Sequence, residues 1–275
     1  MELTSRQDFM QLPDINFRET KRSSNKIIFL SCEGAVTEEG YFDLIKEFFS
    51  EIKSKIEFVS VLQDIRNKER KERTKEEENL LKQSRPDQLV RKMDDFKAEN
   101  EQKYGFTLHE EDEFWIITDV DNNTNEEKNR YTGVSNKEKW DKVLEDCEEK
   151  SYNLAISNPF FELWLLLHHD DVQADDYKFA VTERHVYEPT EHFRERLQKR
   201  GAKLINNGKK VRKQDYDIIK VKQAVERAKT LHNQELNACK SDEERELSEK
   251  WPHTLGSTVY RLLDNIINLY DESLK

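Results

Sequence analysis

Three acidic residues come directly after strand-like runs, where carboxylates from different strands can reach a common site. Glu33 follows the apolar run at 26–32 (KIIFLSC), and Asp119 and Asp121 follow the run at 113–118 (EFWIIT). If both runs are strands of one parallel sheet, their carboxyl ends lie at the edge where such sheets bind ligands. Carboxylate oxygens without His or Cys suit Mg²⁺ or Mn²⁺. Asp-x-Asp is also common in ordinary turns, so the residues alone leave both interpretations open.

Hydrophobic periodicity predicts the elements that would position these residues. Short apolar runs predict strands at 26–32, 56–62, 113–118 and 152–157. Apolar residues at helical spacing predict helices from 37, from 86, over 137–150 and over 160–168. This alternation favours a mainly parallel sheet flanked by helices. After residue 170 the pattern predicts helices at 191–200, 218–232 and 259–270, and hence a mostly helical C-terminal part.

The fourth predicted strand leads into a helix through Ser157, Asn158 and Pro159. Asn is a good N-cap and Pro is favoured at the first helical position, so we expect these residues to start the helix. Contact with a phosphate is the alternative role for Ser157 and Asn158. Glu38, near the start of the first predicted helix, is either stabilised by the helix dipole or takes part in metal binding.

Composition limits the classes of function. The 275 residues include 46 Lys and Arg against 57 Asp and Glu, a net charge of −11, which argues against a generally basic nucleic-acid coat. No apolar run approaches the roughly 20 residues of a membrane span, and the N-terminus has no apolar signal core. Three widely spaced cysteines form no CxxC pair, so we expect reduced thiols in a cytoplasmic protein.

Two charged stretches are candidates for contact with nucleic acid. The compact basic cluster GKKVRK contains Lys209, Lys210, Arg212 and Lys213. Such clusters attract phosphates, although a solvated loop explains them equally well. The stretch 66–83 supplies a possible second arm, with a solvated helix or an insertion as the simpler interpretation; its basic members are Arg66, Lys68, Arg70, Lys71 and Arg73.

Four segments carry a resemblance to a known family. Residues 27–42 (IIFLSCEGAVTEEGYF) resemble the opening motif of the RloB-like family, a branch of the TOPRIM fold, and residues 114–121 (FWIITDVD) resemble its second motif. Residues 156–168 (ISNPFFELWLLLH) are similar to its third motif, and residues 251–263 to its closing segment. The matches occur in order over about 26–270, and they leave out the N-terminal residues and the charged stretch.

The resemblance implies an α/β, TOPRIM-like fold and a division of the chain into three parts. These are an N-terminal tail at 1–25, a catalytic core at 26–170, and a mostly helical remainder at 171–275 of the same RloB-like domain. In the TOPRIM fold, a glutamate after the first strand and Asp-x-Asp after the third gather Mg²⁺ ions, and these positions match Glu33, Asp119 and Asp121. Glu162 is expected beside them, at the same end of the fourth strand. Lys213 is similar in position to a lysine that several TOPRIM nucleases use in this region of the chain.

The function implied is a Mg²⁺- or Mn²⁺-dependent endonuclease that acts as an effector of bacterial phage defence by abortive infection. Analogy with ATPase-paired TOPRIM effectors favours RNA such as tRNA over DNA, and an ABC-type ATPase as the partner protein. Neither a membrane nor a covalent tyrosine intermediate is expected. The alternative is a non-catalytic regulator that binds nucleic acid or a nucleotide and signals to the ATPase.

Overall fold

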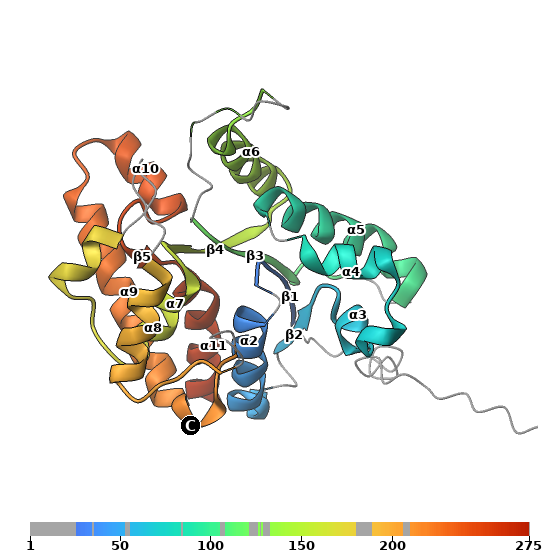
Figure 1. Cartoon of the computed structure of the whole chain (residues 1–275), viewed down its shortest axis with the longest axis horizontal. Helices are drawn as coiled ribbons and strands as arrows, with labels where there is room; N and C mark the ends of the chain where they lie inside the picture. The colour runs from blue at the N-terminus through green and yellow to red at the C-terminus, as the bar shows by residue number, and fades with distance from the viewer. Residues whose placement is uncertain are drawn as a thin grey trace, which may run out of the picture.

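A five-stranded sheet forms the centre of the molecule (Figure 1). The computed structural model describes residues 26–34, 36–52, 56–83, 85–104, 108–120, 126, 128, 133–179, 189–205 and 210–274. The strand order is β2-β1-β3-β4-β5. The first four strands are parallel and β5 is antiparallel to β4. The strands are β1 (Lys26–Cys32), β2 (Ile56–Ser60), β3 (Glu113–Asp119), β4 (Asn153–Asn158) and β5 (Gly256–Ser257).

Side chains of β1 alternate between the two faces of the sheet, as the pleat requires. Ile28 and Leu30 belong to a hydrophobic core on one face of the sheet, whereas Ile27 and Phe29 belong to a second core on the opposite face. Both faces of the sheet are therefore covered, which explains the uninterrupted apolar run Ile27–Leu30 in β1.

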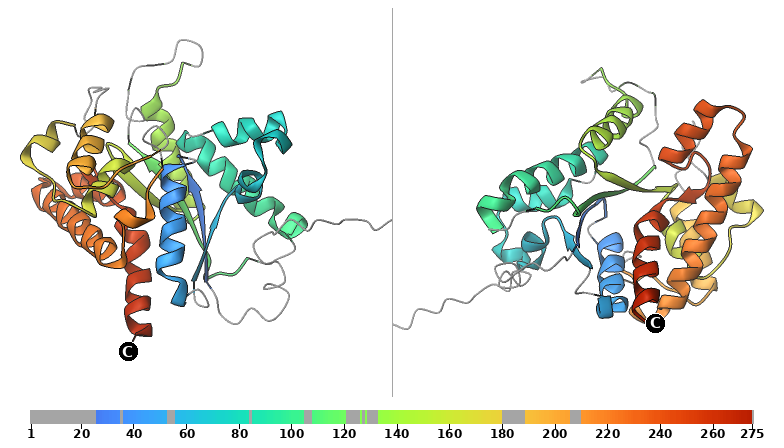
Figure 2. Two further views of the ribbon diagram at one scale, coloured as in Figure 1. Left: turned by 60° about the horizontal axis from the view of Figure 1, so that its bottom comes forward. Right: turned by 180° about the vertical axis from the view of Figure 1, so that it is seen from behind.

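Helices from both halves of the sequence cover the first of these faces (Figure 2). Phe49, at the end of α2, packs its ring against Tyr270 of α11 with 5.2 Å between centroids. The core that includes Ile28 continues without a break into α9 and α11, so the C-terminal helices complete the core of the sheet. These elements are α2 (Thr37–Phe48), α7 (Phe161–Leu167), α8 (Pro189–Lys199), α9 (Ile218–Ala238) and α11 (Val259–Ser273).

The opposite face is covered by α5 and α6, with α3 and α4 beside α5 (Figure 1). The helix α10 packs against α9, and its last residue, Lys250, forms an ion pair with Glu148 of α6. The bounds are α3 (Gln63–Asn67), α4 (Lys75–Lys82), α5 (Pro86–Tyr104), α6 (Asn136–Glu149) and α10 (Asp242–Lys250). Short 3₁₀ segments occur at Ser50–Ile52, Arg70–Glu72, Ala174–Phe179 and Lys213–Asp215. Within the described ranges, no helix has the length and apolar character needed to cross a membrane.

The predicted α/β class, with a mainly parallel sheet and a helical C-terminal part, is confirmed. Two local details differ from the expectation. The sequence pattern does not predict β5 or α10. The helix after β4 begins at Phe161, no side chain caps it, and Asn158 instead donates from Nδ2 to the Pro252 carbonyl at 3.0 Å.

The limits of the three predicted parts of the chain stay predictions. The tail at 1–25 lies outside the described residues. Within 66–83 the structure has ordered helical turns rather than an irregular insertion. Thr74 caps α4 by accepting from the Glu77 amide at 3.1 Å, and the Glu77 carboxylate accepts in return from the Thr74 amide at 2.9 Å.

Candidate functional site

Glu33 and Asp119 lie side by side at the carboxyl ends of adjacent parallel strands. The register pairs Cys32 of β1 with Ile117 of β3, and the Glu33 amide continues the ladder by donating to the Ile117 carbonyl at 2.9 Å. The Glu33 carboxylate accepts at Oε2 from Thr118 Oγ1 at 2.6 Å and from the Asp119 amide at 3.0 Å. Two hydrogen bonds to one oxygen fix the orientation of this carboxylate, so a side chain and a backbone amide of β3 together position Glu33.

Asp119 is a half-buried carboxylate in an electronegative environment. Burial raises its pKa well above the usual range, and the charges of Glu33, Glu38 and Glu162 raise it further. A backbone hydrogen bond from Phe161, at the start of α7, acts in the opposite direction. Four carboxylates from β1, α2, β3 and α7 therefore lie close enough to repel one another, and we name Glu33, Glu38, Asp119 and Glu162 the carboxylate cluster.

Glu38 reaches the cluster from the first turn of α2. Burial raises its pKa to about 7, and the charges of Glu33 and Glu162 add to the effect. Its side chain folds back over Gly34, whose backbone donates a hydrogen bond to it. A Cβ at position 34 would lie 1.7 Å from Glu38 Oε2, so only glycine leaves room for the carboxylate there.

Glu162 completes the cluster from the first turn of α7 and is buried. Its Oε1 accepts two hydrogen bonds from Arg194 of α8, from Nε at 3.0 Å and from Nη2 at 2.6 Å. The expectation that Glu162 lies at the same strand ends as Glu33 and Asp119 agrees with this placement. The structure also brings a guanidinium to the cluster that the sequence does not predict.

Lys213, which is also predicted for the site, forms its ion pair outside the cluster. Lys213 pairs with Glu47, near the opposite end of α2. Glu47 lies nine positions after Glu38 on α2, which corresponds to about 13.5 Å along the helix axis. The Lys213 side chain thus meets an acidic partner on α2 outside the cluster, and a catalytic role for Lys213 stays a prediction. Asp121 lies outside the described residues.

The described residues of the predicted nucleic-acid-binding cluster contact different partners. Arg212 binds Asp215 through Nε and Nη2, both at 2.8 Å, and so holds its own turn together. Lys210 is exposed, and its backbone pairs with Ile205. Lys209 lies outside the described residues. A role for Lys210 in binding phosphates stays a prediction, whereas Arg212 is engaged in an internal ion pair.

The predicted second basic arm is partly turned inward. Arg66 forms an ion pair with Glu39 of α2, and burial lowers its pKa to about 10. Arg73 donates to the carbonyls of Ile65, Arg66 and Lys68, so it closes the turn that connects α3 and α4. These two side chains stabilise the segment, and they are not displayed to solvent as a phosphate-contacting arm would be. Lys71, with a side chain 75% exposed, remains on the surface.

The chemistry of the carboxylate cluster fits a hard divalent cation. All its donors are carboxylate oxygens, and burial of like charges is costly unless a cation compensates them. As the side chains stand, no three acidic, His or Cys side chains within the described ranges are arranged to hold a metal ion. If a divalent ion binds here, Glu33, Asp119 and Glu162 would supply part of its ligand set, together with Asp121, which lies one residue beyond the described end of the β3 segment.

The raised pKa of Glu38 leads to a prediction about stability. Its folded-state value of about 7 lies above the ordinary value of 4.5. The folded state therefore holds this proton more tightly, and the stabilisation is present below pH 4.5 and is lost as the pH rises through about 7. In EDTA, the Tm of the parent chain minus the Tm of Glu38→Gln should fall as the pH rises from 4.5 to about 7. Added Mg²⁺ should reverse the fall at the upper end of the window.

Glu47→Gln, at the exposed end of the same helix, is the control for this pH series. The Tm of the parent chain minus the Tm of Glu47→Gln should not show this fall as the pH rises. A Tm difference for Glu38→Gln that is constant across the same pH window, with and without Mg²⁺, would contradict the placement of Glu38 in a buried anionic cluster.

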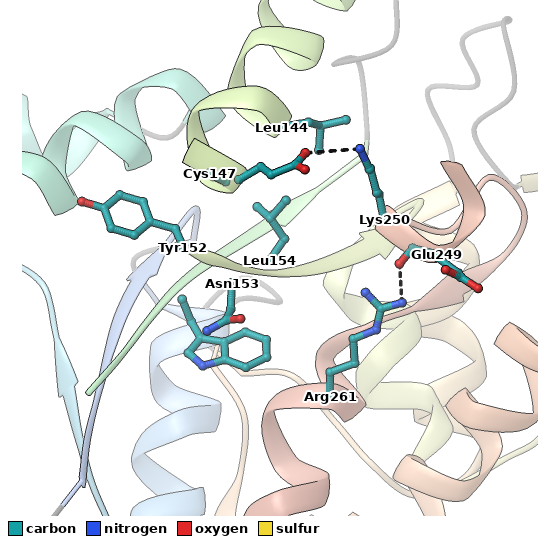
Figure 3. Close-up of a pocket in the computed structure, with 10 residues that line it drawn as sticks. Leu144, Cys147, Tyr152, Asn153, Leu154, Glu249, Lys250 and Arg261 are labelled. Atoms are coloured by element: carbon teal, nitrogen blue, oxygen red, sulfur yellow. Dashed lines mark hydrogen bonds and ion pairs between the residues drawn. The ribbon is translucent and has the colours of Figure 1, made fainter. Parts of the chain in front are cut away.

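A pocket of about 290 Å³ lies away from the cluster (Figure 3). It is formed where β3 and β4 begin, by Trp115, Tyr152 and Asn153, whereas the cluster lies where these strands end. Lys250 on its rim pairs with Glu148 at 3.3 Å, and Arg261 donates to the Glu249 carbonyl at 2.5 Å. Both cationic side chains of the pocket thus have partners within the protein, and the pocket lies at the opposite end of β3 and β4 from the carboxylate cluster.

Two residues of the cluster region show the limits of sequence reasoning. The TEE motif at the helix start marks Glu38 as either a helix-dipole acid or a metal-site residue, without deciding between the two. Arg194 has no such signal, because it belongs to a helix rich in both Glu and Arg whose other basic residues look equivalent.

Comparison with known proteins agrees with this arrangement of motifs. No curated protein and no solved structure gives a significant match to the chain. A family model described as RloB-like protein matches residues 28–266, a range that contains all five strands except the first two residues of β1, and every member of the carboxylate cluster. Because this match covers most of the chain, the protein belongs to the RloB-like family.

Proposed function

We propose that this chain is a Mg²⁺- or Mn²⁺-dependent phosphodiesterase that cleaves nucleic acid internally. The observation that supports the proposal is the buried carboxylate cluster at the ends of β1, β3 and β4, in which Asp119 is surrounded by three further acidic side chains. Such a cluster has an unfavourable charge without a cation and a suitable donor set with one. Glu33, Asp119, Asp121 and Glu162 are the residues that would hold the metal.

A divalent ion in such a site lowers the pKa of bound water and stabilises charge on a phosphate. The chain's own contribution is to fix the ligands. Thr118 and the Asp119 amide hold the Glu33 carboxylate, and Arg194 holds that of Glu162. Asp119 is held by the backbone at the start of α7. Ligands fixed in this way require little reorganisation when the ion binds.

The substrate, cellular setting and partner are proposed from the family resemblance. We propose RNA such as tRNA as the substrate, in preference to DNA, and a role as a cytoplasmic effector of phage defence by abortive infection. An ABC-type ATPase is the proposed partner protein. These parts of the proposal rest on analogy with ATPase-paired TOPRIM effectors, and the arrangement of the carboxylates is compatible with either nucleic acid.

The competing function is a non-catalytic regulator that binds nucleic acid or a nucleotide. The two functions differ in what they need from Asp119. A metal-dependent enzyme loses turnover when this ligand is removed, whereas a binding protein retains its affinity for nucleic acid. The burial of Asp119 among other carboxylates favours the enzyme, because a binding surface for phosphates gains nothing from concentrated negative charge.

The direct test is a cleavage assay with the purified full chain. Total tRNA, single-stranded RNA and plasmid DNA are incubated with Mg²⁺, Mn²⁺ or EDTA, and the products are separated on gels. We expect internal cleavage of RNA with either metal, none in EDTA, and none with Asp119→Ala. Metal-independent products, or equal cleavage by Asp119→Ala, would refute metal-dependent catalysis at this cluster. Nucleic-acid binding without any cleavage would support the regulator.

A further inference from the structure

Helix α8 carries a guanidinium to the rim of the carboxylate cluster. Arg194 approaches Glu162 from a segment that lies 32 residues further along the chain, with Nε and Nη2 both directed to Oε1. The Arg194 side chain is 35% exposed, whereas that of Glu162 is 8% exposed. The pair therefore extends from the buried cluster to solvent, with the carboxylate inside and the guanidinium outside.

The contact leaves donors and an acceptor available on both partners. Both hydrogen bonds end on Oε1 of Glu162, and within the described part of the chain neither Glu162 Oε2 nor Arg194 Nη1 forms a further hydrogen bond or ion pair. Glu162 can therefore offer Oε2 to a cation while Oε1 keeps Arg194 in place. Arg194 in turn keeps N–H groups for an anion on its solvent side.

Other cations of the region are occupied elsewhere. Lys213 pairs with Glu47, Arg212 pairs with Asp215, and Arg66 pairs with Glu39, which belongs to α2 but not to the cluster. Arg66 is also the more enclosed of the two arginines near the cluster, with a side chain 15% exposed. Among the described residues, Arg194 is the cation in direct contact with a cluster carboxylate.

We propose that Arg194 binds a phosphate group of the nucleic-acid substrate beside the carboxylate cluster. This inference rests on the proposed function and assigns to Arg194 the phosphate contact that the sequence suggests for Lys213. A guanidinium presents a planar set of donors that matches phosphate oxygens. The anchor on Glu162 fixes this set before the substrate binds, which lowers the entropy cost of the contact. Arg194 thereby offsets the repulsion between the cluster and a polyanion.

The test is equilibrium binding of two probes, a labelled tRNA and a labelled DNA duplex, followed by fluorescence anisotropy. Each titration is carried out in Ca²⁺ and repeated over a series of KCl concentrations. The probe is checked for integrity on a gel after each titration. The variants are Arg194→Gln, Arg194→Lys and the matched control Arg200→Gln. Arg200 follows the C-terminal end of the same helix, is 51% exposed and pairs with Asp170, outside the cluster.

We expect Arg194→Gln to weaken binding about tenfold and to lower the salt slope by about one unit, the loss of a single phosphate contact. Arg194→Lys should keep the slope, because the charge is retained, while losing part of the affinity. Arg200→Gln should match the parent chain. A Mn²⁺ titration followed by electron paramagnetic resonance should give the same number of bound ions for Arg194→Gln and the parent chain.

Three outcomes would overturn the inference and leave the proposed function standing. The first is an unchanged salt slope of binding in Arg194→Gln. The second is a loss of nucleic-acid affinity in Arg200→Gln equal to that in Arg194→Gln. The third is a loss of Mn²⁺ binding in Arg194→Gln. The last would show that Arg194 acts by holding Glu162 rather than by contacting phosphate. If the parent chain binds neither probe and cleaves neither nucleic acid, the proposed function and this inference fail together.

Discussion

Asp119→Asn should abolish cleavage and at the same time raise the thermal stability of the metal-free protein. Asparagine keeps the shape of the side chain but removes a charge that burial and three neighbouring carboxylates disfavour. Loss of residues that merely support metal ligands costs about 10–100-fold in activity or metal affinity, so loss of a ligand should cost at least about a hundredfold. A gain of about 1 kcal/mol in folding free energy would raise Tm by roughly 2–4 °C in a chain of this size.

The matched control is Asp43→Asn, which removes the same charge from a position on α2 where the side chain is 67% exposed. This variant should change neither the cleavage rate nor the Tm of the metal-free protein. Initial cleavage rates in Mg²⁺ and Tm in EDTA, measured on the same preparations, provide the readouts. An Asp119→Asn protein that is less stable in EDTA than the parent would show that the folded protein compensates the Asp119 charge without a metal ion.

Arg196→Ala should strongly destabilise the C-terminal part of the chain. Arg196 lies between Asp176 and Asp170, and the Asp176 side chain is only 1% exposed. Removing one partner of a buried ion pair leaves an uncompensated charge and typically costs about 3–5 kcal/mol. His192 also contacts Asp176, from Nε2 at 2.6 Å.

Arg200→Ala tests the specificity of that effect. Arg200 shares the partner Asp170 but is half exposed, and exposed ion pairs contribute about 0–1 kcal/mol. Urea denaturation of the two variants and the parent compares their free energies of unfolding. The double variant Arg196→Ala, Asp176→Asn should recover part of the loss, because it removes the stranded charge. Equal stability of Arg196→Ala and Arg200→Ala would refute a buried network.

The sheet and its two central carboxylates could be predicted because their causes are local. A continuous apolar run such as 26–32 is the pattern of a strand covered on both faces, and the strand–helix alternation requires parallel crossovers. Once β1 and β3 are parallel neighbours, Glu33 and Asp119 must lie at one edge. Their proximity follows from the sheet topology, and the hydrogen bond from the Asp119 amide to the Glu33 carboxylate shows that the two residues are adjacent.

The contacts that the sequence does not reveal are those of side chains whose partners are distant in sequence. Asn158 has the residue type and position of an N-cap, but it donates to Pro252, 94 residues away. Lys213 stands in a basic cluster, yet its charge is matched by Glu47, 166 residues away. Nothing in the local pattern distinguishes Arg194, which contacts Glu162, from Arg196, which contacts Asp176. Tertiary packing makes these choices, and a single sequence does not display them.

The central claim is that the carboxylates at the strand ends hold a catalytic divalent ion. Anomalous scattering from crystals soaked in Mn²⁺ tests it most directly, because the ion itself is located. We predict a manganese peak bounded by the carboxylates of Glu33, Asp119 and Glu162, and its absence from crystals of the correctly folded Asp119→Asn variant. A protein that cleaves RNA with Mn²⁺ in solution, but whose crystals show the manganese elsewhere at saturating concentration, would contradict the claim.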